Sequence, residues 1–510
     1  MEIDDLKKEN AELRAINAKQ AEQIELLQEQ VAYLTAKIFG KSSEQSPENG
    51  QTSLFDDDNQ GVFNQPESTG EQIRHPEVPQ KKRTTQQTKI TKALPIKKEV
   101  IHLAHRHCDR CGELYNVFEK QVGQKLHYQP ARLYIEQKYQ EVGKCRRCSL
   151  DETLDGDKLV NATMPTPFMS HSLASPDLVA QIIANKYVLA LPLDRQRQLF
   201  QKMGLTIYEP TLCNWVLAAA KCLDPLNRLL LAQLKTQSHL HGDETPIQVL
   251  REPGKPPSSK SYLWEVRSAK ATNQPIVYFH YAPSRSEVVA KDLYAGYRGT
   301  LLCDGYSGYN HLPPTVTRAG CWAHVRRKFW EAANGILSQQ SIGHRAVKLI
   351  DELFRLEKQF ENLSADQRLK QRQKKSQPLI DQFWDLMAQT QAIAKSKLGK
   401  AITYAFNQRE PLMVFLTDGA VALSNNIAER GIKHTVIGRK NWLFSTGQAG
   451  AKANALFLGL FETAKANGIN FGNYLTYLLM RIPQLGPFPT TAQLAAYLPW
   501  HKDIRQNCLD

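Results

Sequence analysis

The sequence predicts a multidomain α+β protein, with N-terminal modules, a mixed α/β core and a helical C-terminus. Three observations support this prediction. A chain of 510 residues is longer than one hydrophobic core usually serves. Heptad, cysteine-pair, strand-like and helical patterns follow one another along the chain. Strand-like segments and helical segments also share one region, which is typical of a mixed sheet with covering helices.

Residues 1–42 form a predicted coiled coil. β-branched residues dominate the a positions and leucines the d positions, which favours a parallel two-stranded coil, and an a-position asparagine fixes the register. The chain is therefore expected to form a homodimer or a higher oligomer. A single amphipathic helix packed on its own chain is the alternative. The a positions are Ile3, Asn10, Asn17, Ile24, Val31 and Ile38, and the d positions are Leu6, Leu13, Gln20, Leu27 and Leu34.

Residues 43–95 are rich in glutamine, serine, proline and asparagine and poor in aliphatic side chains, which predicts a disordered linker.

The formal net charge of +14 is unevenly distributed along the chain. Residues 1–80 hold 7 Lys/Arg and 16 Asp/Glu, so their net −9 leaves about +23 on the remainder. A body this basic favours a polyanionic partner, nucleic acid first. A basic surface without a specific partner is the alternative.

Residues 96–160 form a predicted zinc-binding ribbon. The segments "HCDRCGELY" and "GKCRRCSL" are two CxxC knuckles, and four thiolates complete a tetrahedral structural Zn²⁺ site. His105 or His107 could replace one ligand. Nine cysteines are too few for a disulfide framework in this chain, so a reducing cytoplasm is expected. The expected ligands are Cys108, Cys111, Cys145 and Cys148.

Residues 170–235 are predicted to be helical and to resemble a helix-turn-helix. One helix precedes a turn at Gly204, and a second begins near Glu209 and Pro210, where proline suits the first helical turn. Helix-turn-helix DNA readers have this layout. A plain αα-hairpin has it as well, so DNA contact here stays open.

Residues 236–450 contain the core. Three strand-like segments, "SHLHGDETPIQVL", "SYLWEVRS" and "PIVYFHYA", precede a helix, "SRSEVVAKDLYAGY", and a fourth strand, "GTLLCDGYSGY". A meander, a crossover helix and a parallel fourth strand predict an RNase H-like α/β fold. "VTRAGCWAH" is expected to be the fifth strand and "VRRKFWEAANGIL" the next helix. Residues 335–415 read as a helical insertion, and residues 451–510 as a helical C-terminal region.

Three acids, distant in sequence, are candidates for one metal site. In an RNase H-like fold the first and fourth strands are neighbours, so Asp243 and Asp304 would converge. Glu429 lies in a helical segment where Asn425, Glu429 and Lys433 are spaced to share one face. Two Mg²⁺ ions held by carboxylates can clamp the attacking and leaving oxygens of a phosphodiester. The alternatives are surface roles for these acids, with Glu244 and Asp418 as rival ligands.

The order of the motifs resembles the transposases of the insertion sequence 66 family, which belong to the DDE class. The resemblance covers nearly the whole chain. It rests on "FGKSSE", "SLFDD", the double CxxC module with "YQPARLYIEQKY", "LPLDRQRQLFQKMG", "TLCNWV", "GDETPIQV", "CDGYSGYN", "CWAHVRRKF" and "NNIAERGIKHTVIGRKNWLF".

This resemblance implies that Asp243, Asp304 and Glu429 are the catalytic acidic triad and hold two Mg²⁺ or Mn²⁺ ions. Cys321 and His324 resemble a C-x-x-H signature of several DDE transposases, for which a structural or end-binding role is implied. A buried cysteine beside a capped histidine is the alternative for that pair.

The basic residues after Glu429 are implied to hold DNA phosphates, and Trp442 to stack on a base, with a packed core tryptophan as the alternative. Lys433 stands where many family members carry arginine, which keeps the charge but loses bidentate contact. The implied DNA-binding residues are Asn425, Arg430, Lys433, Arg439 and Lys440.

The function implied is a DNA transposase. It would bind the terminal inverted repeats of an insertion sequence, cleave to free 3′-hydroxyls and join these to target DNA. The partners implied are DNA, a second subunit and small accessory proteins of the same element, in a bacterial cytoplasm at the nucleoid. No window of 18 apolar residues exists, so no membrane partner is expected. A DNA-binding regulator with an inactive core and a nuclease without strand transfer are the alternatives.

Overall fold

The computed structural model describes residues 133–144 and 159–509, except Ala271, Gly335, Leu337 and Gln339, together with six isolated helical residues between Leu13 and Gln23. Two compact units divide the chain, one formed by residues 1–48 with 137–510 and the other by residues 49–136; the fold below is that of the first. Most of the predicted coiled coil, the whole linker and the four knuckle cysteines lie outside the described residues. Strands β1 (Val142–Lys144) and β2 (Leu159–Asn161) pair antiparallel at the edges of the predicted ribbon.

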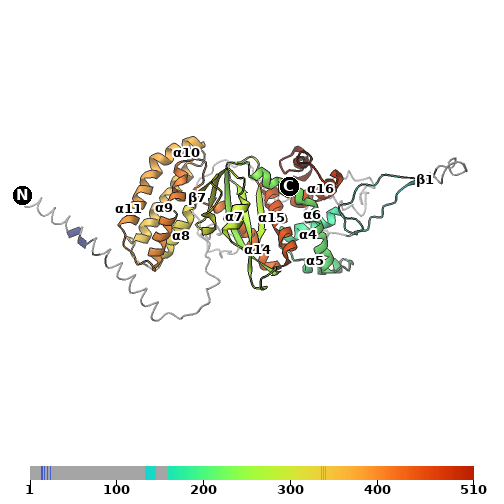
Figure 1. Ribbon diagram of the computed structural model, residues 1–510, viewed down its shortest axis with the longest axis horizontal. Coiled ribbons are helices and arrows are strands. Elements are labelled where there is room, and N and C mark those ends of the chain that lie inside the picture. The colour runs from blue at the N-terminus through green and yellow to red at the C-terminus, as the bar shows by residue number, and fades with distance from the viewer. Residues whose placement is uncertain are drawn as a thin grey trace, which may run out of the picture. The chain divides into compact units, whose positions relative to one another are not determined.

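The main sheet has the strand order β5-β4-β3-β6-β7, and Figure 1 shows it in the middle of the described chain. β3 pairs antiparallel with β4, and β4 with β5, whereas β6 runs parallel to β3 and β7 parallel to β6. The predicted meander, crossover helix and parallel fourth strand are therefore confirmed. The strands are β3 (His239–Arg251), β4 (Lys260–Ser268), β5 (Val277–Ala282), β6 (Gly299–Cys303) and β7 (Val316–Gly320), and the crossover helix is α7 (Glu287–Leu293).

One face of the sheet is covered by helix α15 (Gln448–Ala466), which is buried on nearly all sides. A helix that is apolar all round belongs between two packed layers. α15 lies between β5 and helices of the next layer, as Figure 1 shows. Gly459 permits the close approach to the sheet, since a Cβ there would lie 3.2 Å from the Val277 carbonyl oxygen.

The layer beyond α15 joins the segments before and after the sheet. Helix α4 begins at Pro176, where the Ser175 side chain accepts the Leu178 N–H and caps it. The helices of this layer share one hydrophobic cluster with β3, β4, β5 and α15. The helices are α4 (Pro176–Tyr187), α5 (Leu193–Lys202), α6 (Glu209–Leu234), α16 (Phe471–Arg481), α17 (Thr491–Ala495) and α18 (Lys502–Cys508).

Helices α5 and α6 are the two helices predicted on either side of Gly204. That glycine has φ +90°, a left-handed conformation that glycine adopts without strain. α6 begins at Glu209 as predicted. Its contacts with DNA stay a prediction.

Among the described residues, no helix is both long enough and apolar enough to cross a bilayer.

The helical insertion builds a second hydrophobic cluster beside β6 and β7. Edge-to-face aromatic contacts join Trp322, Phe329 and Phe383. Helix α8 (Trp322–Ala333) precedes the insertion and packs on it. The elements of the insertion are α9 (Ile342–Gln359), α10 (Ala365–Gln371), η3 (Arg372–Ser376), α11 (Gln377–Gln389), α12 (Lys397–Asn407), α13 (Arg409–Met413) and η4 (Val414–Leu416).

One boundary differs from the sequence-based expectation. The fifth strand, predicted to run to His324, ends at Gly320, and α8 begins at Trp322 with Cys321 as its N-cap residue. Trp322, Val325 and Phe329 are buried at helical spacing, so packing against the insertion selects the helix. His324 therefore lies in the first turn of a helix.

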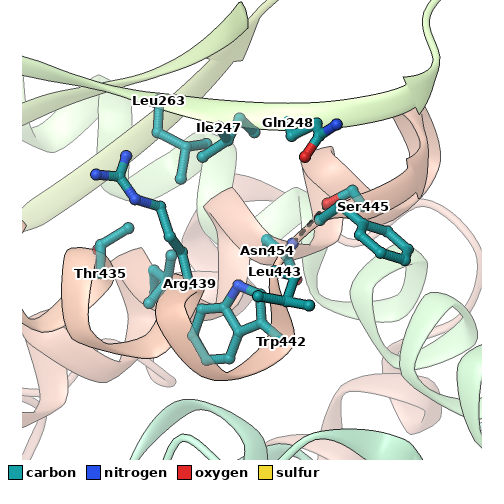
Figure 2. Close-up of a pocket in the computed structure, with 11 residues that line it drawn as sticks. Ile247, Gln248, Leu263, Thr435, Arg439, Trp442, Leu443, Ser445 and Asn454 are labelled. Atoms are coloured by element: carbon teal, nitrogen blue, oxygen red, sulfur yellow. Dashed lines mark hydrogen bonds between the residues drawn. The ribbon is translucent and has the colours of Figure 1, made fainter. Parts of the chain in front are cut away.

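Helix α14 (Asn426–Trp442) packs against β3 beside α15, with its His434 ring 4.9 Å from the Phe461 ring of α15, and β8 (Ser445–Gly447) then pairs parallel with the far end of β3. A small pocket lies between β3 and the end of α14, with Arg439 and Trp442 on one side (Figure 2). Asn454 of α15 donates to the Ser445 hydroxyl at 2.9 Å and holds β8 in place. α14 is thus fixed against both the sheet and α15.

Arg372 ties the insertion to the loop before α14. Its side chain is fully buried, and its N–H groups reach the Glu357 carboxylate and three backbone carbonyls at 2.8 to 3.0 Å. All five guanidinium donors of an arginine are thereby used. The carbonyls belong to Phe415, Asp418 and Val421.

We expect Arg372→Met to lower the free energy of unfolding of the insertion by about 3–5 kcal/mol, because it leaves the half-buried Glu357 carboxylate and three carbonyls without their donors. Urea unfolding followed by tryptophan fluorescence measures this, since Trp322 and Trp384 belong to the same cluster. Arg355→Met, which removes an exposed pair with Glu352, is the matched control and should leave the midpoint unchanged. Equal midpoints for both variants would contradict the role of Arg372.

Candidate active site

Asp243 and Asp304 lie side by side on neighbouring parallel strands. The register pairs Leu240 with Leu301 and His241 with Leu302. Asp243 comes two residues after His241, and Asp304 comes two residues after Leu302. The two aspartates therefore stand at matching positions on the same face. Asp304 comes directly after the end of β6, where its Oδ1 accepts the Tyr306 N–H at 3.0 Å. The predicted convergence of the first and fourth strands thus brings these two acids together.

The carboxylates at this edge are crowded. Burial raises the pKa of Asp243 well above its ordinary value, and the neighbouring Glu244 and Asp304 raise it further. Burial and then Asp304 also raise the pKa of Glu244. Like charges this close favour protonation unless a cation neutralises them. The arrangement is that of acids suited to a bound cation.

The rival acids Glu244 and Asp418 already have protein partners. Glu244 is almost fully buried and accepts the Tyr309 hydroxyl at 2.6 Å and the Arg285 Nε–H at 2.6 Å. Asp418 pairs with His239 at 2.7 Å. Arg285 also lies 4.0 Å from Asp304, with its guanidinium over the Tyr306 ring. Arg285 therefore balances part of the charge beside Asp304.

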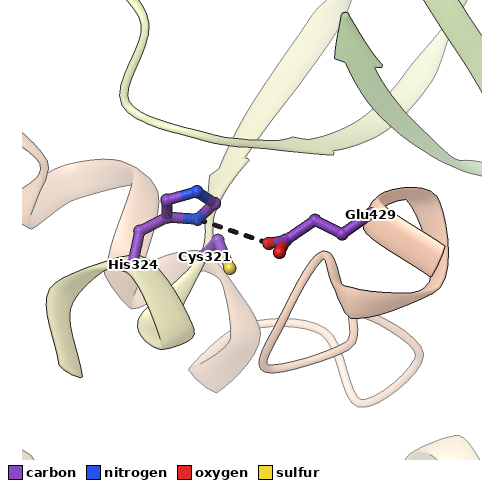
Figure 3. Close-up of side chains that lie close together, drawn as sticks. All are labelled: Cys321, His324 and Glu429. Atoms are coloured by element: carbon purple, nitrogen blue, oxygen red, sulfur yellow. Dashed lines mark ion pairs between the residues drawn. The ribbon is translucent and has the colours of Figure 1, made fainter. Parts of the chain in front are cut away.

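Glu429 lies in the first turn of α14 and faces the start of α8. Its Oε2 lies 3.4 Å from the Arg327 guanidinium and its Oε1 lies 3.8 Å from His324 Nδ1 (Figure 3). Within the described part of the chain, Cys321, His324 and Glu429 are the one group of three possible ligands whose atoms all lie within 4.8 Å of one another. The three predicted acids do not form such a group.

The pKa of His324 depends on the charges of both Glu429 and Asp304. Burial lowers the pKa of His324, while the nearby Glu429 and then Asp304 oppose that shift. Asp304 in turn acts on Asp243. Glu429 is thus on the same side of the core as the two aspartates, with His324 next to it.

Asn425 was predicted to contact DNA, and the structure corrects this. The residue is buried, and its side chain bonds His241 Nδ1 at 2.8 Å and the Gly242 carbonyl at 2.8 Å. Its backbone N–H donates to Cys321 Sγ at 3.2 Å. Asn425 is the N-cap position of α14, so its side chain turns toward β3 instead of sharing the outer face of the helix. Asn425 thereby holds the first turn of α14 against Gly242, the residue before Asp243.

The predicted basic residues divide into two groups. Arg430, Lys433 and Lys440 are exposed along α14. Arg439 is half-buried, donates to Thr245 Oγ1 at 3.1 Å and to the Pro246 carbonyl, and burial lowers its pKa. Trp442 is half-buried and packs edge-on against Tyr187 with ring centroids 5.8 Å apart, which favours the core alternative.

A second charged cluster, not predicted from the sequence, lies under α14. Glu265 stands opposite Asp243 on β4, is fully buried, and bonds Arg267 at 3.1 Å. Arg267 also donates to the Ile427 carbonyl at 2.7 Å. A Cβ on Gly431 would lie 2.3 Å from this guanidinium, so α14 needs glycine there. The signal was present in the sequence, as a Glu and an Arg inside the apolar run "SYLWEVRS".

Residues 171–453 match the family model described as "Transposase IS66 family". The chain belongs to the IS66 family of transposases. A second family model, "Transposase C of IS166 homeodomain", matches residues 26–98, all of which lie outside the described residues.

Three uncharacterized proteins of Sinorhizobium fredii are similar to this family member. y4qI is 32% identical over 68% of this chain and 66% of its own length, y4hP is 31% identical over 77% and 73%, and y4jD is 30% identical over 81% and 81%. Among solved structures, the Drosophila P element transposase strand transfer complex aligns with 61% of this chain and 93% of that chain at 12% identity, with a TM-score of 0.33.

We expect Glu265 to make stability fall as pH rises. Burial raises its pKa from 4.5 to about 8, although Arg267 opposes the shift. The folded chain then holds a proton that the unfolded chain has released between these pH values. The stabilisation is present below about pH 4.5 and is lost toward pH 8, by up to about 1.4 kcal/mol per pH unit.

Glu265→Gln removes this titration. The unfolding free energy of the variant relative to wild type should rise between pH 5.5 and pH 7.5, as measured by urea unfolding. Glu361→Gln changes an exposed acid and should show a constant difference. A constant difference for Glu265→Gln as well would show that this carboxyl ionises normally.

Proposed function

We propose that this IS66-family chain cleaves the ends of its insertion sequence and joins the freed 3′-hydroxyls to target DNA, with Asp243, Asp304 and Glu429 as the catalytic acids of an RNase H-like core. The observation that carries the proposal is the pair Asp243 and Asp304, side by side on β3 and β6 inside the matched residues 171–453. The strand order of the sheet supports it.

The acids fit the divalent metals that a DDE transposase uses. Hard oxygen ligands suit Mg²⁺ or Mn²⁺. Burial and the neighbouring acids Glu244 and Asp304 have raised the pKa of the Asp243 carboxyl, and a bound cation would lower it again. Asp243, Asp304 and Glu429 would hold two such ions. When bound, these ions would supply activation of the attacking oxygen and stabilisation of the leaving oxygen.

The chain's own residues would then position the DNA and the acids. Arg327 holds one oxygen of Glu429, and Arg285 neutralises Glu244 beside Asp304. In the first step a water oxygen bonds to the phosphorus at the element end and the bond to the 3′-oxygen breaks. In the second step the freed 3′-oxygen bonds to a target phosphorus and displaces another 3′-oxygen. No covalent bond to the protein is formed.

DNA would lie along the outer face of α14. Arg430, Lys433 and Lys440 are exposed and spaced at three and seven residues, which places them on one stripe of the helix. This stripe begins next to Glu429, so it would guide the phosphates toward the acids. Arg439, bonded within the chain, is left out of this proposed contact. Recognition of the terminal repeats by α5 and α6 and by the zinc ribbon, and pairing of subunits by the coiled coil, complete the proposal.

We expect Asp243→Asn to abolish nicking of end DNA in Mg²⁺ while binding of that DNA is unchanged, because the amide removes a metal ligand but not the fold. A gel assay with labelled end DNA and a second assay with precut ends measure cleavage and joining. Asp418→Asn changes a rival acid paired with His239 and should leave both steps near wild-type rates.

Cleavage by Asp243→Asn would exclude the acid assignment. Cleavage without joining by the wild-type chain would identify a nuclease, and binding without cleavage a regulator.

The double change Lys433→Ala and Lys440→Ala should weaken DNA binding about equally across sequences. Each lysine that contacts a phosphate contributes about 0.9 to the slope of log K against log salt, so the slope should fall by about two. Fluorescence anisotropy at several salt concentrations measures it. Lys270→Ala, an exposed lysine paired with Glu361, is the control and should leave the slope unchanged. An unchanged slope in the double variant would place DNA elsewhere.

A further inference from the structure

We propose that Cys321, His324 and Glu429 bind a thiophilic divalent cation, Zn²⁺, at a site distinct from the ribbon cysteines and from the two aspartates. The three side chains come from the starts of two helices that pack on the same sheet. Cys321 is the N-cap residue of α8, His324 lies in its first turn, and Glu429 lies in the first turn of α14. Figure 3 shows the three side chains pointing toward a common point.

The separations suit ligands better than hydrogen bonds. His324 Nδ1 and Glu429 Oε1 lie 3.8 Å apart, and the three possible ligand atoms all lie within 4.8 Å of one another. A hydrogen bond between nitrogen and oxygen needs about 3.2 Å or less. Two ligands of a tetrahedral zinc ion, with bonds of about 2.0–2.3 Å, stand about 3.3–3.6 Å apart. A small adjustment of the side chains would therefore enclose an ion.

Two of these atoms are buried and lack a partner. His324 Nδ1 and Glu429 Oε1 make no hydrogen bond, although neither is reached by solvent. An unsatisfied buried polar atom costs about 1–3 kcal/mol, so two of them facing each other indicate a missing ligand. The other carboxylate oxygen, Oε2, faces Arg327, which leaves Oε1 for the ion. One bound cation would satisfy both atoms.

The sulfur is placed as a thiolate ligand would be. Cys321 Sγ accepts the Asn425 N–H at 3.2 Å, and the backbone N–H groups of Ala323 and His324 also point at it. Burial raises the pKa of the Cys321 thiol to about 12, and these amide donors oppose that rise because they stabilise the thiolate that a bound cation would require. Thiolate, imidazole and carboxylate together select Zn²⁺ and disfavour Mg²⁺, and three protein ligands leave one position open.

The bound ion would clamp the start of α8 to the start of α14. Asn425 already joins the two helices through Cys321, and the ion would add a bond from each helix to one centre. Because Glu429 is one of the ligands, the ion would also fix the side chain of that acid. The zinc site shares Glu429 with the proposed catalytic acids, but zinc binding is measured without DNA cleavage, so failure of this proposal is distinguishable from failure of the proposed function.

The full-length chain is stripped with a chelator and titrated with Zn²⁺, and bound zinc per chain is measured by mass spectrometry. The cobalt-substituted chain is followed by its thiolate charge-transfer band. We expect Cys321→Ser and His324→Gln to bind one zinc fewer than wild type, or to bind it more than about 100-fold more weakly, because loss of an outer partner alone costs 10–100-fold. The cobalt band should shrink in Cys321→Ser.

Three variants keep the test decisive. Cys508→Ser changes another buried free cysteine and should bind as wild type does. His324→Cys supplies a different zinc ligand and should restore the ion that His324→Gln loses, while equal circular dichroism shows that both fold. Asp243→Asn should retain the ion. Zinc content and affinity in Cys321→Ser and His324→Gln equal to those of Cys508→Ser would overturn the proposal.

Discussion

The parallel pairing of β3 with β6 is the constraint on which the rest of the core depends. It places Asp243 and Asp304 at matching positions, although 60 residues of meander and crossover separate them. A parallel pair needs a long right-handed connection, and β4, β5 and α7 provide it. Burying the two acids together raises the pKa of Asp243, and the sheet tolerates this because α15 and the helices beyond it supply a large apolar cluster.

Helix α14 is the second element that this sheet positions. Its contacts with the strands are polar and specific, since Asn425 bonds His241 and Gly242 while Gly431 lies against Arg267. Polar contacts of this kind fix one orientation of a helix, whereas apolar packing alone tolerates sliding. With its inner face held in this way, α14 presents Glu429 to α8 and its basic stripe to the outside.

The sheet was predictable from sequence because its strands are short apolar runs separated by turns, and a meander followed by a crossover helix leaves few topologies. The start of α8 was not, because "CWAH" has no alternation or helical period of its own and Trp322 is placed by Phe383, about 60 residues later. Asp243 and Asp304 followed from strand order. The burial of Asn425 and Arg439 could not be predicted, because helical spacing shows which residues share a face of a helix but not which other element covers that face.

Glu429 has more neighbours than membership of an acidic triad would require. Its two oxygens face different groups, Oε2 toward Arg327 and Oε1 toward His324 and Cys321. An acid that served only the aspartates would need neither sulfur nor imidazole beside it. Glu429 and Asp304 both oppose the lowering of the His324 pKa, so His324 is near both acids. A cation bound beside His324 at Cys321 would therefore also change the electrostatic potential at the aspartates. The two helix starts and the two strand ends therefore influence one another electrostatically.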